Sequence, residues 1–199
     1  MDRRKFLLGL GVLPFLGTSL FSTNSAHGTN EFVLVGLGDA GDSFSSEIKK
    51  MGFKGKVYGI QVTKSDNLHI RQTERLLHGE NLAEGPNFLF STFTKQNDIV
   101  PIFVAGLGGI RSTYLAALAY HEMTKLGRPF HMFLTTPFNF EGSLRNSRAK
   151  RFRSAMEPDS RIKCINLNDC PRDVWPTIKQ GFTKFPPQVI YQEIQKLMG

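Results

Sequence analysis

The sequence has few cysteines and lacks the residue patterns of several common metal and catalytic sites. Cys164 and Cys170 are too few for a disulfide framework and are not spaced like the ligands of a zinc knuckle, so we expect ordinary thiols. His121 and Glu122 are followed by Lys125 where a zinc-protease helix has its second histidine. No serine stands in a nucleophile-elbow pattern. We therefore predict neither a metal site nor a serine hydrolase.

The sequence also lacks a hydrophobic run long enough for a membrane-spanning helix. Its most apolar stretch near the start, residues 7–21, falls short of the roughly 20 residues that a bilayer requires. Arg3 and Arg4 precede this stretch, and Ala26-His27-Gly28 follows it as a small-x-small cleavage site. Residues 1–28 resemble a bacterial twin-arginine (Tat) signal peptide. The prediction is export to the periplasm or cell envelope; the alternatives are an uncleaved basic membrane anchor, a mitochondria-like signal or a cytoplasmic protein.

Acidic residues are fewer than basic ones, which gives the 199-residue chain a formal net charge of +8. Such a charge is compatible with nucleic acid, anionic lipid or nucleotide phosphate as a partner, and does not distinguish them. The basic segment 143–156 is more typical of a solvated helix face than of a nucleic-acid site. Nucleic-acid binding is not indicated, and contact with a membrane is expected only through an uncleaved N-terminal signal.

What the chain does have is an alternation of strand-like and helix-like segments. Strands are expected at residues 31–35, 57–62, 99–104, 130–135 and 162–167, and helices at 43–51, 71–77, 112–126, 143–156 and 188–198. This alternation predicts a three-layer α/β fold with a parallel sheet and helices on both faces. Residues 79–87 read as a loop. Pro101 is an irregularity, because proline cannot donate a hydrogen bond within a central strand.

A glycine cluster at residues 105–113, AGLGGIRST, joins the third strand to a long alanine-rich helix. Backbone N–H groups at the start of such a helix point above the sheet edge, where the helix dipole favours an anion. Gly106, Gly108 and Gly109 allow close backbone approach, whereas Ile110 and Arg111 add bulk and charge. The cluster is interpreted as an altered nucleotide site.

A second glycine pattern, Gly36-x-Gly38-x-x-Gly41, follows the first strand. On its own it matches the dinucleotide fingerprint, or simply a tight strand-to-helix turn. The acidic residue that the fingerprint needs after the second strand is missing, because residues 61–63 are Gln-Val-Thr. A nicotinamide or flavin dinucleotide is therefore disfavoured.

Three motifs in register resemble the tubulin/FtsZ family. Residues 35–41 resemble its first phosphate loop, residues 105–109 the start of its glycine-rich signature loop, and residues 137–142 with Arg145 its fifth nucleotide loop. Asn168-Asp169 after a strand resembles the loop on the base side. The resemblance covers residues 31–198, and it implies a Rossmann-like nucleotide-binding domain over residues 29–199, with the family's second domain absent.

The resemblance implies a site that binds GTP or GDP. Glu141 would bond the ribose hydroxyls, Arg145 would lie near the nucleotide, and Asn168 would read guanine. Together with the matched loop positions, the nucleotide-binding residues expected in this way are Gly36, Gly38, Gly41, Gly106, Gly108, Gly109, Thr113, Glu141, Arg145 and Asn168.

The chain also departs from the family pattern. The signature loop continues as Ile110-Arg111-Ser112-Thr113-Tyr114, in which only Thr113 matches, and Asp39 and Asp42 replace glycines in the first loop. The acidic loop that activates water in the family has no counterpart. GTP hydrolysis is therefore not expected, and the prediction is a binding or assembly-related scaffold that self-associates or serves a partner protein.

An alternative hypothesis keeps the crevice and changes the ligand. Arg111 and Arg145 would clamp another phosphorylated or carboxylated molecule, with Asp39 or Asp42 as new polar partners. Because a fold does not fix a function, both hypotheses stay open at this point.

Overall fold

The structure is a computed structural model that describes residues 31–62, 66–78, 98–156, 158–171, 173–174 and 177–198. The predicted signal peptide and the predicted loop at 79–87 lie outside the described residues. Within the described ranges, no helix has the length and apolar composition needed to cross a membrane.

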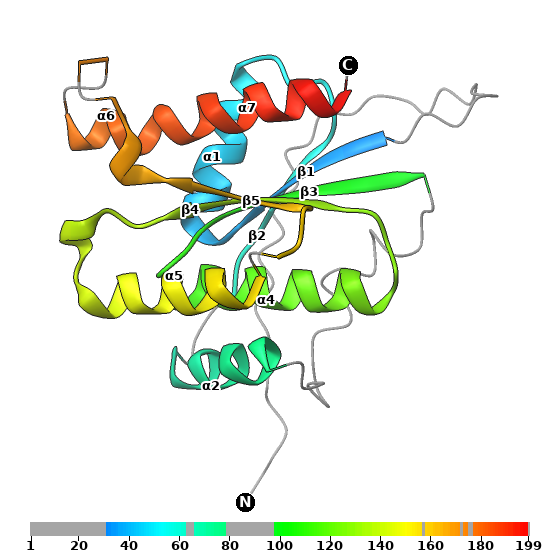
Figure 1. Ribbon diagram of the computed structural model, residues 1–199. Helices are drawn as coiled ribbons and strands as arrows, with labels where there is room; N and C mark the ends of the chain where they lie inside the picture. Colours follow the sequence, from blue (N-terminus) through cyan, green and yellow to red (C-terminus); the bar gives the residue numbers. More distant parts are fainter. Residues whose placement is uncertain are drawn as a thin grey trace, which may run out of the picture.

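A five-stranded parallel sheet forms the centre of the molecule (Figure 1). Its strands are β1 (Glu31–Leu37), β2 (Val57–Ile60), β3 (Ile99–Gly106), β4 (His131–Thr136) and β5 (Ile162–Asn166). They are arranged in the order β2-β1-β3-β4-β5. This confirms the predicted α/β class. Because the order reverses between β1 and β3, the carboxyl ends of these two strands define the switch point where such folds bind ligands.

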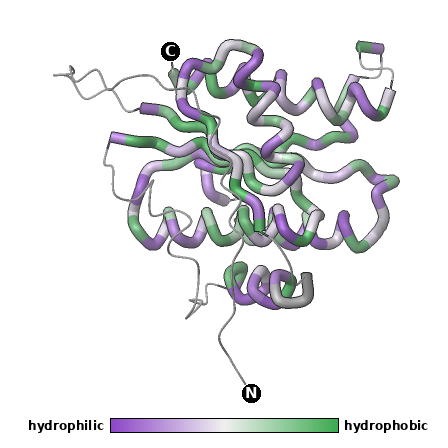
Figure 2. Tube along the Cα trace, turned by 180° about the vertical axis from the view of Figure 1, so that it is seen from behind, coloured by the Kyte–Doolittle hydropathy of each residue, from purple (hydrophilic) through white to green (hydrophobic). Residues whose placement is uncertain are grey.

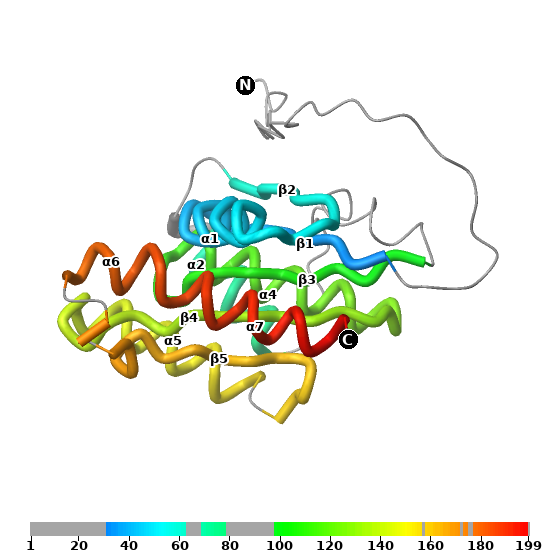
Figure 3. Tube along the Cα trace, turned by 90° about the horizontal axis from the view of Figure 1, so that it is seen from above, coloured from blue at the N-terminus to red at the C-terminus, as the bar shows by residue number. Residues whose placement is uncertain are grey.

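Helices cover both faces of the sheet. On one face lie α1 (Gly38–Lys50), α6 (Ile178–Thr183) and α7 (Phe185–Met198). On the other lie α4 (Ile110–Lys125) and α5 (Ser143–Met156), with α2 (Asp66–Leu77) packed outside α4. Two short 3₁₀ turns, η1 (Asn139–Glu141) and η2 (Leu167–Asp169), follow β4 and β5. Figure 3 shows α1 and α7 side by side above the sheet.

The core has two apolar layers, one on each face of the sheet, because successive side chains along a strand point to opposite faces. Val33, Val35 and Leu37 of β1 face α4, whereas Leu34 of β1 packs with residues of α1 and α7. Figure 2 shows the hydrophobic colouring concentrated in the central strands. Because helices cover both faces of the sheet, the central strands have nearly continuous apolar sequences.

Helix α1 begins at Gly38, earlier than the predicted residue 43, so the glycine pattern runs from the end of β1, at Gly36, into the first turn of the helix. A Cβ atom on Gly41 would collide with the carbonyl oxygen of Val104 in β3. The glycine is therefore required for α1 to approach the sheet, and this contact outweighs the low helix propensity of glycine.

Proline positions agree with the chemistry of the backbone. Pro101 is paired with Val33 of β1, while β4 pairs with β3 only from Ile102 onward, so the proline has one neighbouring strand. Pro186 and Pro187 lie in the first turn of α7, where a helix N–H has no intrahelical partner. For this reason α7 begins before the predicted residue 188.

Candidate functional site

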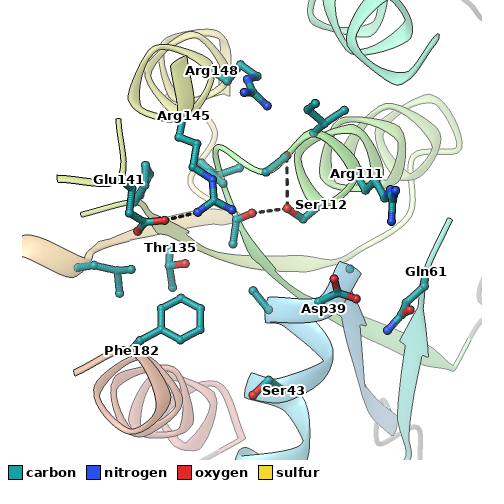
Figure 4. A pocket seen from close by; sticks show the side chains of 18 of the residues that line it. Asp39, Ser43, Gln61, Arg111, Ser112, Thr135, Glu141, Arg145, Arg148 and Phe182 are labelled. Carbon is teal, nitrogen blue, oxygen red and sulfur yellow. Dashed lines mark hydrogen bonds and ion pairs between the residues drawn. The ribbon is translucent and has the colours of Figure 1, made fainter. Parts of the chain in front are cut away.

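A crevice with a volume of about 550 Å³ opens at the carboxyl edge of the sheet (Figure 4). Residues from every layer of the fold line it: Gly38, Asp39, Ala40, Ser43, Gln61, Val62, Gly106, Leu107, Gly109, Ile110, Arg111, Ser112, Thr135, Pro137, Glu141, Arg145, Arg148, Leu167 and Phe182. It therefore lies at the switch point between β1 and β3, as the fold requires of a ligand site.

The N-termini of α1 and α4 meet in the middle of this crevice. A Cβ atom on Gly38, whose φ is +69°, would lie 2.9 Å from Cβ of Ser112, and one on Gly106 would lie 2.9 Å from Cβ of Ala40. Glycine at these positions is what lets the two helix starts approach. Two converging helix N-termini supply backbone N–H groups and positive partial charge to one place.

Internal hydrogen bonds already use part of the glycine loop that follows β3. The N–H of Leu107 donates to the Thr135 carbonyl at 2.8 Å, and the N–H of Gly108 donates to Oγ1 of Thr113 at 3.0 Å. The first intrahelical bond of α4 runs from Thr113 N–H to Gly109. The backbone donors toward the crevice are therefore those of the first turn of α4 rather than those of Leu107 and Gly108.

The Ser112 hydroxyl also bonds within this loop, so its proton is not directed to a ligand. Its hydroxyl donates to the Gly106 carbonyl at 2.5 Å, from within the first turn of α4. Thr113 is buried, and its side chain accepts the Gly108 hydrogen bond. Thr113, the one residue of 110–114 that matches the family pattern, thus stabilises the loop conformation.

Arg145 crosses from α5 toward the start of α4. One guanidinium nitrogen, Nη1, forms an ion pair with Glu141, and Nη2 lies 3.9 Å from where a Cβ on Gly109 would stand. The loop is tight here, because a Cβ on Gly108 (φ +91°) would lie 2.8 Å from the Arg145 carbonyl oxygen. The guanidinium group can therefore reach an anion at the α4 N-terminus while it remains bonded to Glu141.

Both oxygens of Glu141 are engaged within the protein. Oε1 accepts the N–H of Phe138 at 2.9 Å, and Oε2 pairs with Arg145. The ribose contact that the resemblance implies for Glu141 would require one of these bonds to be shared or exchanged. The Arg145 side chain is half exposed, so its pair with Glu141 is weakened by solvent.

Asn168 lies beside the crevice and does not line it. Its Oδ1 accepts the N–H of Asn139 at 2.9 Å, and its Nδ2 donates to the Pro137 carbonyl at 3.3 Å and to Oδ1 of Asn166 at 2.9 Å. The side chain thus joins the loop after β4 to the loop after β5. Its neighbour Leu167 lines the crevice instead.

The predicted residues that line the crevice are Gly38, Gly106, Gly109, Glu141 and Arg145. Gly36 and Gly41 lie behind it: a Cβ on Gly36 would stand 2.6 Å from the Gly41 carbonyl oxygen, and one on Gly41 would collide with β3. Asp39 lines the crevice, but the Asp42 carboxylate sits against Gly59 of β2. The role of polar partner to the alternative ligand therefore fits the position of Asp39 and not that of Asp42.

Sequence reasoning missed two lining residues, Arg148 and Phe182. Arg148 lies one turn after Arg145 in α5, and the i, i+3 spacing of the two arginines was a usable signal. Phe182 belongs to α6, whose start carries a capping box: Thr177 and Gln180 each accept the other's backbone N–H at 3.2 Å. That T-x-x-Q pattern could have located α6.

The position of Phe182 depends on contacts with α1. Its ring packs against Phe44, with centroids 5.4 Å apart, and Lys184 at the end of α6 bonds to Glu47 of α1 at 2.8 Å. Hydrogen bonds from Lys184 and then Lys50 lower the pKa of Glu47 to about 2. The aromatic wall of the crevice is thereby joined to the helix whose N-terminus forms its floor.

The charges in the crevice favour an anion. The cationic side chains are Arg111, Arg145 and Arg148, and the acidic ones are Asp39 and Glu141. Within the described part of the chain, no three His, Cys, Asp or Glu side chains lie together as metal ligands would. The arrangement can hold phosphate or carboxylate at the helix N-termini with arginine beside it.

Comparisons with known proteins agree with this geometry at the level of the fold. No protein-family model matches the sequence, and no curated protein is significantly similar to it. Among solved structures, the empty FtsZ dimer of M. jannaschii matches with a TM-score of 0.60 and 18% identity, over 85% of this chain and 54% of that chain. CetZ from Methanosaeta thermophila strain DSM 6194 matches with a TM-score of 0.56 and 10% identity, over 84% of this chain and 54% of that one.

The chain therefore has an FtsZ-like α/β fold. It spans about half the length of these two structures. At these identities the likeness establishes the fold alone, and what the crevice binds has to be argued from its own residues.

Proposed function

We propose that this chain is a divergent FtsZ-like nucleotide-binding (GTP-type) domain that acts as a binding or assembly-related scaffold and does not hydrolyse its ligand. The observation that carries the proposal is the meeting of the α1 and α4 N-termini beside Arg145 at the switch point of the sheet. A pyrophosphate group there would receive backbone N–H donors, two helix dipoles and a guanidinium group.

The rest of the crevice supports a nucleotide rather than a bare phosphate. Phe182, Leu167 and Pro137, which follow β4 and β5, form an apolar wall of the crevice against which a base could pack. Glu141 lies beside Arg145, on the same side of the crevice as Phe182 (Figure 4), where it could meet the ribose of a bound nucleotide. The ligand would thus lie with its base toward α6 and its phosphates toward α4. The scaffold would then act by self-association or by binding a partner protein.

Calorimetric titration of the purified protein with GTP, GDP and inorganic phosphate tests the proposal. Arg145→Ala should weaken binding of GDP about 10- to 150-fold, as expected for loss of a charged hydrogen bond worth about 1.5 to 3 kcal/mol. Arg151→Ala is the matched control, because Arg151 lies on the same helix and pairs with Glu74 of α2 outside the crevice. Equal effects of the two variants, or no binding of GTP or GDP, would contradict the proposal.

A second candidate is favoured by the bonds of Glu141 and Asn168. Both side chains are bonded within the protein, so a ribose or a guanine would have to compete with these internal bonds. The same crevice would then hold another phosphorylated or carboxylated ligand between Arg145 and Arg111. Mass analysis of small molecules released from the purified protein separates the candidates: a guanine nucleotide supports the first, and another anion supports the second.

We further propose that the domain is exported through the Tat-type signal in residues 1–28. The support is the Arg3-Arg4 pair before a weakly apolar run and the Ala26-His27-Gly28 site. Changing both arginines to lysine should hold the protein in the cytoplasm with its signal intact, whereas the unaltered chain should begin near Thr29 outside it. Fractionation with N-terminal sequencing checks this, and an unchanged location in the variant would contradict it.

A further inference from the structure

The crevice is longer than the stretch of sheet edge that carries the two helix N-termini. At one end it is lined by Leu167 and Phe182, which follow β5, and at the other by Gln61 and Val62, which follow β2. Since β2 and β5 are the two edge strands, the crevice runs across the carboxyl ends of the whole sheet. Figure 4 shows Phe182 and Glu141 on one side, Gln61 and Arg111 on the other, and Asp39 toward the latter.

A phosphate group at the α4 N-terminus would divide this crevice into two parts. The part toward α6 contains the apolar wall and would hold the nucleoside of the proposed nucleotide. The part toward β2, which we name the β2-side lobe, is lined by Asp39, Gln61, Val62 and Arg111. A nucleoside diphosphate bound with its base toward α6 would leave the β2-side lobe to a further group.

The side chains of the β2-side lobe suit a neutral group that carries hydroxyls. Gln61 offers two amide donors and a carbonyl acceptor, Asp39 offers carboxylate acceptors, and Arg111 offers guanidinium donors. One acidic and one basic side chain leave the lobe without excess charge. A further phosphate would meet the Asp39 carboxylate, which lies in the first turn of α1, and like charges at about 4 Å repel appreciably.

The position of the lobe at the switch point gives a second reason. Doubly wound folds bind their ligands in the crevice where the strand order reverses, with the phosphates over the helix N-terminus, so a group attached to the phosphates can extend to either side of that point. Here the apolar wall and the β2-side lobe lie on opposite sides of the β1/β3 switch point.

We propose that the ligand is a pyrophosphate diester: a nucleoside diphosphate whose second phosphate carries a hydroxylated group, either a sugar or a second nucleoside, that lies in the β2-side lobe. This inference rests on the proposed nucleotide-binding function and specifies its ligand class. Gln61 and Asp39 are then the residues that distinguish the diester from a mononucleotide, and Arg145 serves both ligands alike.

The experiment is calorimetric titration with GDP, GTP, GDP-mannose and P1,P2-diguanosine diphosphate. GDP-mannose or the dinucleotide should bind more tightly than GDP, and which of the two does so identifies the group. Gln61→Ala should weaken binding of that diester about 2- to 10-fold, the effect of one neutral hydrogen bond, and leave GDP within about 2-fold. Gln192→Ala, the same change at an exposed position of α7, is the control.

Asp39→Ala provides a second test, in which the affinities for GTP and for the diester should change in opposite directions. Removing the carboxylate should tighten GTP, because a like charge near its terminal phosphate is lost, and should weaken the diester, because an acceptor for its hydroxyls is lost. Circular dichroism spectra of both variants establish that they are folded. GDP binding without any preference for a diester, or a Gln61→Ala loss shared equally by GDP, overturns the inference while the proposed function stands. Failure of all four ligands to bind overturns both.

Discussion

At the scale of single residues, the glycines of the first loop serve packing as much as ligand approach. Gly41→Ala should lower the free energy of unfolding by about 3 kcal/mol or more, because the added methyl group collides with the Val104 carbonyl oxygen and α1 must move away from β3. Gly127→Ala is the comparison. A Cβ there meets nothing within 4 Å, and its φ of +61° costs only about 1 to 2 kcal/mol for a residue with a side chain.

Urea denaturation of both variants measures the difference, and equal losses would contradict the packing role of Gly41. The same glycine shows the limit of sequence reasoning at this scale. Gly36-x-Gly38-x-x-Gly41 correctly located a strand-to-helix turn, but the pattern does not say which glycine faces a ligand and which faces another strand. That distinction depends on the approach of α1 to β3, a contact between segments far apart in the chain.

At the scale of elements, the bond between Glu47 and Lys184 joins α1 to the α6–α7 junction beside Phe182. The pKa of Glu47 is about 2 in the folded protein, below its ordinary value of 4.5. The ion pair therefore contributes stability above about pH 4.5, and this contribution is lost as the pH falls toward 2. Because both side chains are partly exposed, we expect no more than about 1 kcal/mol at pH 7.

A double-mutant cycle with Glu47→Gln and Lys184→Ala, measured by urea denaturation, isolates this contribution. The coupling free energy between the two residues should be present at pH 7 and decrease progressively between pH 4.5 and 2. A coupling that stays constant over this range would show that the charge of Glu47 does not hold the two elements together.

An element could be predicted from the sequence when its own residues carry a clear pattern. The five strands and the long helices follow from hydrophobic runs and breaker residues, and the structure has all of them. Helix α6 has only six residues and lies in a stretch without periodicity, so its capping box was its only signal. Helix α7 begins before the predicted residue 188, because the first helical turn accepts Pro186 and Pro187.

At the scale of the whole molecule, the alternation of strands and helices was sufficient to predict the parallel sheet, and the structural neighbours confirm an FtsZ-like fold. The extent of the crevice was not predictable in the same way. It is formed by residues that follow all five strands, and no local pattern indicates that Gln61 and Phe182 open into one cavity. Only the strand order brings these positions to a common edge.

The residues that line the crevice also determine whether GTP is hydrolysed, because hydrolysis requires a group within hydrogen-bond reach that activates water. Among the described residues that line the crevice, the carboxylates are Asp39 and Glu141, and there is no histidine. Both oxygens of Glu141 are already bonded, and Ile110 and Arg111 stand in the first turn of α4. We therefore expect phosphate release from GTP to equal that of a heat-treated control across a range of protein concentrations. Release that rises with protein concentration and is abolished by Asp39→Asn would contradict this expectation and would identify Asp39 as the group that activates water.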